Sequence, residues 1–504
     1  MTAGLTPLDW AIVLAYVGGI VALSWAIARR QRTGTDYFLA GRGMGGLPLG
    51  ASILANQASA ISLVGAPAFV ALREGGGLRW LQYELALPLA MLLLIAFLLP
   101  TLRSVPGSSI YEYAERRFGR GTRGAVAGAF LLSRGLALGV ILYASSLVVA
   151  AATGLGTTAS LLAVGLLSVA YTSLGGIVAD IWSDVAQLAL LWLGTLASAL
   201  YLLARPGLLD AIPAERAQAI VPEFGIHAGS FTLGPMLLGG LFLYLSYYGC
   251  DQSQAQRLLT ARDESAARTA LLITGVLRFP MVLTYCLFGL LLAGLLRIDP
   301  AFAASLEGRP ADSLVPVFLT TQLPAGLRGL LVAGILAAAM SSIDSALNSL
   351  AAVTLEDVFG RAAGGQNVWI GRGTSLAWGL FAVVAGLVFA ESGTAILELV
   401  NLIGSLFYGP LLGAFALGVL TTAVTGRHAV TALVIGLAGN LALALGAPWV
   451  SWLWWNAAGF FSTLAVGALL ARQLPRLPRS AASRREVVVL GGAFVAMLVL
   501  VALL

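Results

Sequence analysis

Long apolar runs alternate with short polar segments along almost the whole chain. Each run holds about twenty residues or more, the length at which an α-helix crosses the hydrocarbon core of a bilayer. The first run is followed by arginines and not by a small-residue cleavage pattern, so we expect a retained helix rather than a signal peptide. The pattern predicts an all-α integral membrane protein with about fourteen spanning helices, at residues 10–28, 47–72, 80–102, 124–152, 157–175, 184–204, 232–250, 268–296, 328–355, 370–391, 394–422, 428–446, 450–471 and 487–504, with a split near Ser392.

Three of these segments contain polar residues and glycines that would interrupt a helix. The second contains Ala55–Ala60, the seventh ends at Ser246–Gln252, and the eleventh contains Asn401 and Tyr408–Pro410. Interrupted helices at matching positions of two halves are typical of inverted-repeat transporters, in which unwound backbone forms the binding site. We therefore expect an inverted-repeat core with broken first and sixth core helices.

The two halves of this core are expected to have five helices each. An odd number of helices turns the second half upside down relative to the first, as alternating access by a rocking scaffold requires. The expected division is a peripheral first helix and cytoplasmic loop at 1–46, a first repeat at 47–204, an extracellular loop at 205–231, a second repeat at 232–422 and peripheral C-terminal helices at 423–504.

Small and hydroxyl-bearing residues share one face of the ninth segment. Ala338, Ser341, Ser342 and Ser345 lie at spacings of three and four, and Asp344 adds a formal charge beside them. Hydrocarbon offers a hydroxyl or carboxylate no partner, so such groups need a reason to be there. They indicate either close helix packing through small residues or an oxygen-rich surface that suits a partly dehydrated sodium ion.

Composition supports the membrane assignment. Only 10% of the 504 residues are charged and 59% are hydrophobic, with a mean hydropathy of +0.91, whereas soluble proteins have roughly a quarter charged residues. The net charge of +6 comes from arginine alone and does not indicate nucleic-acid binding. Scattered Ser and Asp without a paired His or Cys do not form a nucleophile–base set, so we do not expect an enzyme.

Arginines are unevenly distributed between the two sets of loops. If the first loop is cytoplasmic, 20 of the 29 lie on that side, which predicts extracytoplasmic N- and C-termini in a multi-pass cell-membrane protein. These 20 are Arg29, Arg30, Arg32, Arg42, Arg103, Arg116, Arg117, Arg120, Arg123, Arg257, Arg262, Arg268, Arg361, Arg372, Arg427, Arg472, Arg476, Arg479, Arg484 and Arg485.

Two further arginines, Arg134 and Arg278, lie inside predicted helices. Arg134 is about ten residues into its helix, roughly 15 Å deep and near the midplane, where a cation needs a partner. That partner is a substrate carboxylate, an internal aspartate such as Asp184 or Asp344, or a helix C-terminus. Arg278 is expected to be structural.

Four stretches resemble the sodium:solute symporter family, which has a leucine-transporter-like five-plus-five fold. They are Asp36–Arg42 leading into Gly50–Ser52; Tyr111–Tyr113 with Glu115–Phe118; Asp251-Gln252 with Gln256-Arg257; and Ser341-Ser342 through Asn348-Ser349 to Glu356-Asp357. With the hydropathy pattern the resemblance spans roughly residues 30–420.

The resemblance implies particular ion sites. A first sodium ion would be bound by the carbonyls of Ala55, Ala58 and Ala338 and by the hydroxyls of Ser341 and Ser342. A second sodium site, found in some members of the family, would use Asp184, the Ser341 carbonyl, Asp344 and Ser345. Asp344 stands where two-sodium members have a serine, so it binds sodium, carries a proton or pairs with an arginine.

The resemblance also implies a solute site beside the broken helix. Its expected residues are Asn56, Gln57, Ser59, Ser62, Arg134, Tyr247, Asn401 and Ser405. Gly65-Ala66-Pro67 resembles branches of the family that carry carboxylates and other anions.

The expected function is sodium-coupled symport of a small polar organic solute by alternating access. Na⁺ is the expected coupling ion, and the expected partners are the lipid bilayer and a small solute, anionic if Arg134 binds it, with neither nucleic acid nor an obligatory protein partner. Proton coupling through Asp184 or Asp344 is the alternative within transport. A transporter-like membrane sensor is the alternative from another class.

Overall fold

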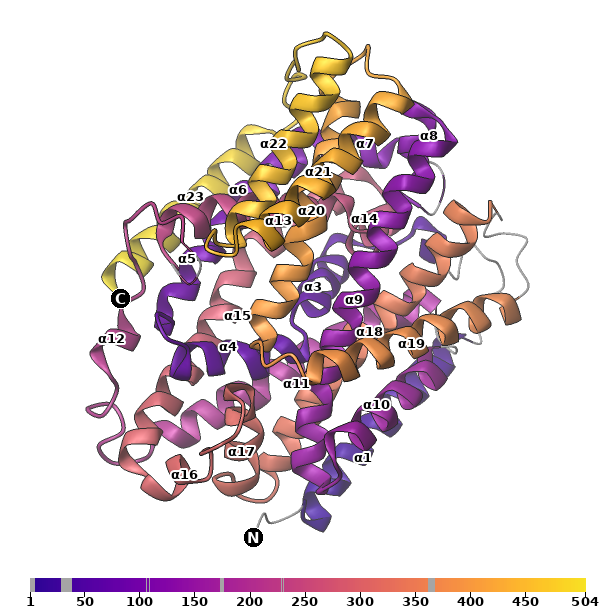
Figure 1. Ribbon diagram of the computed structural model, residues 1–504. Coiled ribbons are helices and arrows are strands. Elements are labelled where there is room, and N and C mark those ends of the chain that lie inside the picture. Colours follow the sequence, from indigo (N-terminus) through magenta and orange to yellow (C-terminus); the bar gives the residue numbers. More distant parts are fainter. Residues whose placement is uncertain are drawn as a thin grey trace.

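The structure, a computed structural model, describes residues 5–28, 39–105, 107, 109–172, 176–227, 229, 231–360 and 368–504. Long helices, many of them tilted, run between two ends of the molecule (Figure 1). Across the described ranges there are no strands, only isolated bridges between Met44 and Ala261 and between His227 and Val450. The predicted all-α fold class is confirmed. The Asp36–Phe38 stretch and four of the predicted loop arginines, Arg29, Arg30, Arg32 and Arg361, lie outside the described residues.

Within the described residues, twelve helical segments are long and apolar enough to cross a bilayer, and the bent pair α3–α4 makes thirteen spans. The predicted span at 157–175 corresponds to α10 (Thr157–Thr172), whose described part is shorter, so the count of fourteen is not confirmed. The spans are α1 (Pro7–Ala28), α3 (Gly46–Gln57) with α4 (Ala60–Leu72), the run from Gly77 to Arg103, α9 (Arg120–Thr153), α11 (Gly176–Leu203), α13 (Leu233–Cys250), α15 (Glu264–Ile298), α18 (Leu327–Val353), α19 (Val368–Ala390), α20 (Ile396–Leu420), α21 (Gly426–Gly446), α22 (Leu453–Leu470) and α23 (Arg484–Leu503).

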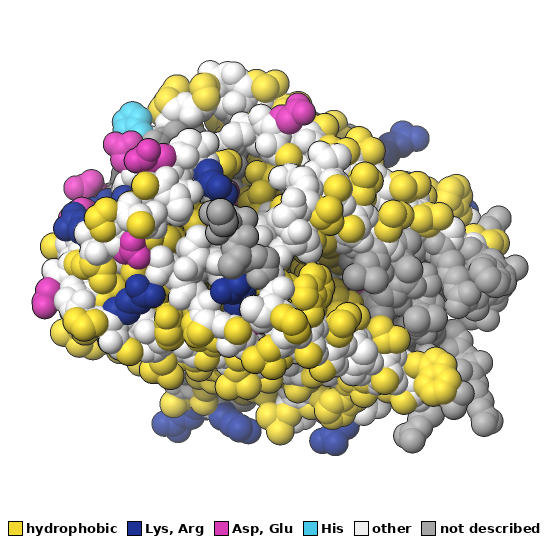
Figure 2. Space-filling view, turned by 90° about the horizontal axis from the view of Figure 1, so that it is seen from below, with side chains coloured by type: hydrophobic (Ala, Val, Ile, Leu, Met, Phe, Trp, Pro, Cys, Tyr) yellow, Lys and Arg dark blue, Asp and Glu magenta, His cyan; other side chains and the backbone are white. Residues whose placement is uncertain are grey.

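Short helices cover the ends of the bundle. α12 (Ala214–Ala217), α16 (Pro300–Ala304) and α17 (Leu314–Thr321) lie toward the lower end in Figure 1, whereas α8 (Glu112–Phe118) lies at the upper end. Figure 2 shows the lower end, with acidic and basic side chains on the end face and apolar side chains around its edge. This distribution is that of a protein whose sides face hydrocarbon and whose ends face water.

α18 is the centre of the bundle and α1 is at its edge. In its most apolar window, the span that contains α18 has 89% of its residues buried, whereas the span formed by α1 has only 12% buried. α18 packs against α9 and α11 and against both halves of the broken pair α3–α4. The serine face of α18 therefore lies against protein and not against lipid.

The eleventh predicted segment is not interrupted, which corrects the sequence-based expectation. α20 continues through Pro410 as a single helix. Proline has no N–H for the carbonyl four residues earlier, Leu406, but the amide of Asn440 on α21 donates to that carbonyl at 3.2 Å. The partner that keeps the helix intact comes from another span, so the local sequence could not reveal it.

Candidate functional site

The first broken helix turns at Ala58 and Ser59, where α4 leaves α3 at an angle of 55°. Ala58 has a ψ of 71°, outside the helical range, and the Ser59 hydroxyl caps the first turn of α4. Side-chain hydroxyls donate to the carbonyls of Asn56 and Gln57 at this break. Within the described residues the carbonyls of Ala55 and Ala58 receive no hydrogen bond, so they are available to a cation.

Ser342 of α18 contacts this break and its neighbour Ser341 contacts α11, and no described group donates to either hydroxyl oxygen. The Ser342 hydroxyl donates to the carbonyl of Asn56 at 3.1 Å, and the Ser341 hydroxyl donates to the carboxylate of Asp184. A hydroxyl has one proton and two lone pairs. Each serine therefore donates its hydrogen bond to a protein acceptor and keeps lone pairs that can bind an ion. Ala338 lies one turn earlier on the same helix and is buried. The structure thus brings together the elements that carry all five proposed ligands of the first sodium site.

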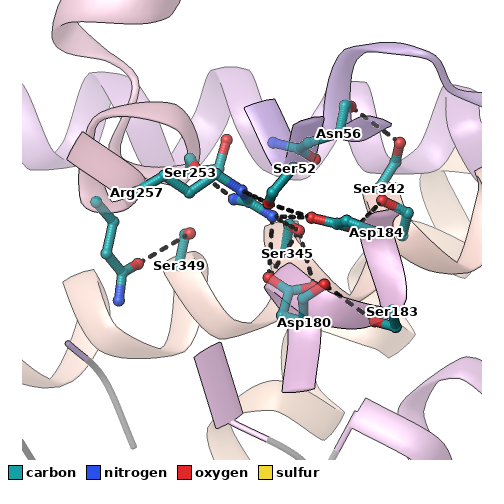
Figure 3. A network of polar contacts seen from close by, with 12 residues as sticks. Ser52, Asn56, Asp180, Ser183, Asp184, Ser253, Arg257, Ser342, Ser345 and Ser349 are labelled. Carbon is teal, nitrogen blue, oxygen red and sulfur yellow. Dashed lines mark hydrogen bonds and ion pairs between the residues drawn. The ribbon is translucent and has the colours of Figure 1, made fainter. Parts of the chain in front are cut away.

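The residues of the implied second sodium site lie close by, and part of that site already holds a positive group. Asp184 and Ser345 both bond to the guanidinium of Arg257, which also contacts Asp180 on the turn of α11 before Asp184 (Figure 3). Asp344 is buried and has an interaction of its own. In the arrangement shown, a guanidinium is bonded to oxygens that the resemblance assigns to a sodium ion.

The position of Arg257 corrects the assignment of this residue to a cytoplasmic loop. It lies on α14 (Gln252–Thr260), a helix that begins at the N-cap Asp251, and it is 1% exposed. All nine residues of α14 are buried, because this helix packs against α3, α13 and α18. The break between α13 and α14 is the predicted interruption of the sixth core helix. The sequence could not show that this short polar helix is enclosed by others, although Asp180 and Asp184 are one helical turn apart and share a face.

Beside the broken helix is a cavity of about 120 Å³. Seven of the eight predicted solute-site residues line it, namely Asn56, Gln57, Ser59, Ser62, Arg134, Tyr247 and Asn401, and so does Ser342 of the first sodium site. The structure does not place Ser405 in this lining: its hydroxyl accepts a hydrogen bond from Asn456 of α22 at 2.8 Å.

Several polar groups around the cavity have no partner in the part of the chain that the structure describes. They include both amide atoms of Asn56, the side-chain oxygen of Gln57, and Nε and Nη2 of Arg134. Arg134 is only 4% exposed, and among the described residues the ion pair of Asp184 is with Arg257 and not with Arg134. Buried polar groups are normally hydrogen-bonded, so this set is suited to a polar ligand that enters the cavity.

A second charged group on the cavity wall was missed at the sequence level. Glu84 on α5 (Leu81–Glu84) pairs with Arg278 on α15, with Nε and Oε2 at 3.1 Å, and accepts the Tyr244 hydroxyl at 2.9 Å. Arg278 is therefore paired internally with Glu84. A glutamate inside an apolar run was the signal that could have identified this site.

A broken helix that presents bare carbonyls, a serine face opposite it and an adjoining polar cavity define a membrane transporter of the inverted-repeat class. A family model described as the sodium:solute symporter family matches residues 37–436. The chain belongs to the sodium:solute symporter family. This family consists of transporters and not enzymes, so the prediction that the chain is not an enzyme is confirmed.

Characterised relatives include three sodium-dependent carriers. The chain is 30% identical over 429 residues to the sodium/iodide cotransporter of Homo sapiens, covering 83% of this chain and 66% of the relative. It is 30% identical over 422 residues to the sodium-dependent multivitamin transporter of Oryctolagus cuniculus (81% and 65%), and 26% identical over 448 residues to sodium-coupled monocarboxylate transporter 1 of Xenopus laevis (86% and 71%). The chain thus spans about two thirds of the length of these relatives.

The fold is shared with a solved structure. A Na⁺-coupled sialic acid symporter, described as substrate-bound and outward-open, superposes with a TM-score of 0.83 at 23% identity, covering 94% of this chain and 99% of the other. The predicted five-plus-five architecture agrees with that likeness.

Proposed function

We propose that this chain couples the downhill movement of sodium to the uptake of a small anion. The observation that carries the proposal is the buried guanidinium of Arg134 at a cavity that adjoins the broken helix, where two of its nitrogens lack a partner among the described residues. A guanidinium there can bind a carboxylate through two parallel hydrogen bonds, the geometry that arginine favours.

Sodium is the coupling ion that the first site suits best. Its proposed ligands are the carbonyls of Ala55, Ala58 and Ala338 and the hydroxyls of Ser341 and Ser342, all of them neutral. Neutral carbonyls and hydroxyls do not take up a proton near neutral pH, whereas they replace the hydration shell of a monovalent cation. An ion held without a formal counter-charge can also leave on the cytoplasmic side, as a transport cycle requires.

The arrangement of Asp184 argues against proton coupling through this residue. Its two oxygens accept hydrogen bonds from the hydroxyls of Ser52 and Ser341 and from the guanidinium of Arg257. A carboxylate that accepts hydrogen bonds and makes none as a donor is in the arrangement of the ionised form.

The size of the cavity favours a compact solute. Its volume of about 120 Å³ is somewhat below the roughly 150 Å³ of an engineered protein cavity that accommodates benzene. A monocarboxylate of three or four carbons, or a halide, matches this volume better than a vitamin does. Two relatives carry solutes of that kind by their names, iodide and monocarboxylates.

The Glu84–Arg278 pair gives the cavity a second polar wall. Nη1 of Arg278 and the hydroxyls of Tyr83 and Tyr285 have no partner among the described residues. We propose that these donors hold a hydroxyl or keto oxygen of the solute while Arg134 holds its carboxylate. The proposed location is a multi-pass cell membrane, with both termini extracytoplasmic as the arginine distribution predicts.

A thermal-shift screen of purified protein tests this proposal. In sodium chloride, lactate, pyruvate or iodide should raise the melting temperature, and each should do so much less when potassium replaces sodium. The Arg134→Gln variant should lose the anion effect and keep the response to sodium alone. Stabilisation by neutral sugars and by none of these anions would contradict the anionic assignment.

A further inference from the structure

Arg257 makes five side-chain hydrogen bonds in the interior of the bundle. Nε donates to the Ser52 hydroxyl of α3 at 2.7 Å, and Nη1 donates to the Ser253 carbonyl at 2.6 Å within α14 itself. Nη2 lies between α11 and α18, and its acceptors are Asp180 at 3.0 Å, Asp184 at 2.9 Å and Ser345 at 2.6 Å (Figure 3). One side chain therefore ties α14 to three spanning helices.

The charges in this cluster do not cancel. Asp180 and Asp184 are 7% and 0% exposed, so both carboxylates are removed from bulk water. The hydroxyls around them are neutral, and Arg257 is the one cation paired with them in the described residues, so the cluster has one more carboxylate than cation. A further positive charge, either a proton or a metal cation, balances such a buried cluster.

The oxygens around Nη2 are the kind of ligands that sodium uses. Asp184 and Ser345 belong to the second sodium site implied by the resemblance, and Asp180 adds a carboxylate that the resemblance does not include. Because Nη2 lies within 3.0 Å of all three residues, an ion coordinated by the same oxygens would have to displace the guanidinium.

We propose that Arg257 is a tethered cation that competes with a second sodium ion for Asp180, Asp184 and Ser345. This inference rests on the proposed sodium coupling and adds a control element to it. When the guanidinium occupies the site, α14 is fastened to α3, α11 and α18. When sodium takes the oxygens, the fastening of α14 to α11 and α18 is released, and the short helix after the Asp251 break is held through Arg257 only by the bond from Nε to Ser52 of α3.

Two features of the structure fit such an exchange. A small cavity of about 10 Å³, roughly the size of one water, adjoins Asp180, Arg257 and Ser345 and gives an ion a place next to the guanidinium. In addition, the contacts run from Arg257 through Asp184 to Ser341, a proposed ligand of the first sodium ion. Occupancy of the first site is thereby linked to the position of α14.

The test measures how sodium affects purified Arg257→Gln protein. The melting temperature is recorded against sodium chloride at constant ionic strength, with choline chloride as the replacement, and ²²Na⁺ binding gives the number of ions per protein. Without the tethered cation, the second ion should bind at a sodium concentration at least roughly tenfold lower than in the wild type, since a lost charge-assisted hydrogen bond commonly corresponds to such a factor. The number of ions bound at low sodium should rise by one.

The double variant Asp180→Asn/Arg257→Gln is the charge-matched control. It has the same formal charge as the wild-type cluster but lacks one carboxylate ligand, so the gain in sodium affinity should disappear. The single variant Asp180→Asn, which keeps Arg257, should need more sodium than the wild type, and it keeps the proposal testable if Arg257→Gln does not fold.

The outcomes separate this inference from the proposed function. Equal sodium dependence of the wild type, Arg257→Gln and Asp180→Asn would overturn the competition and leave sodium coupling intact. Absence of any saturable sodium effect on the wild type would overturn sodium coupling itself.

Discussion

Replacing Ser342 by alanine removes one hydroxyl at the junction of α18 and the broken helix. That hydroxyl is a proposed sodium ligand and also donates to the Asn56 carbonyl at 3.1 Å. Alanine fits the same space because only an oxygen is lost, so the protein should remain folded. The expected effect is on ion affinity.

The magnitude follows from the two interactions that are lost. One neutral ligand, with the hydrogen bond that orients it, is worth about 1–2 kcal/mol. This corresponds to a sodium half-saturation about 5- to 30-fold higher, since about 1.4 kcal/mol is a factor of ten. In the variant the Asn56 carbonyl loses its hydroxyl donor. It lies at the break of α3, beside the cavity, so the loss of sodium-binding free energy should stay within this range.

Binding of ²²Na⁺ to purified protein measures this change without knowledge of the solute. Ser145→Ala is the matched control, because Ser145 is a buried serine of α9 that lines neither cavity and whose hydroxyl donates to the Ile141 carbonyl of its own helix at 2.7 Å. The control should bind sodium like the wild type. If Ser341→Ala and Ser342→Ala also bind sodium with unchanged affinity, the first site does not lie on this helix.

Three further predictions concern charged residues. Asp184→Asn should raise the sodium half-saturation, because Ser341 loses the charged acceptor of its hydroxyl hydrogen bond. Unchanged sodium affinity, ion-to-solute ratio and pH profile of transport would mean that the carboxylate is purely structural. Arg134→Lys should raise the half-saturation for the anion much more than that for sodium, because lysine keeps the charge but lacks the two parallel N–H donors of the guanidinium. A stable variant with normal solute affinity would refute the anion site. Burial raises the pKa of Asp312, outside the spans, to about 6, so its ionised form is less favourable in the folded state than in the unfolded state. As the pH rises from about 4 to about 6, the free energy of unfolding of the wild type should fall relative to that of Asp312→Asn by up to about 3 kcal/mol, which lowers its melting temperature; parallel curves for the two proteins would refute the shift.

The positions of the helices were largely predictable because hydropathy reflects the bilayer thickness. Polar residues within apolar runs also identified the breaks at Ala58 and Asp251, since unwound backbone needs small or capping residues. The continuity of α20 was not predictable, because Asn440 restores the hydrogen bond that Pro410 removes and lies on a different helix.

The candidate sites, too, contain residues that the sequence could identify and residues that it could not. The serine face of α18 was visible because its residues repeat with the period of one helix. The pairing of Arg257 with Asp180 and Asp184 was not, because it joins residues more than seventy positions apart, and an arginine in a short polar stretch resembles the loop arginines that anchor a membrane protein. Contacts that join distant segments require the structure.

Solute uptake into proteoliposomes of purified protein tests the central claim most directly. With an inward sodium gradient, radiolabelled lactate, pyruvate or iodide should accumulate above its equilibrium level, and an equal potassium or choline gradient should give no accumulation. Accumulation driven equally well by a proton gradient in the absence of sodium would contradict sodium-coupled transport of a small anion.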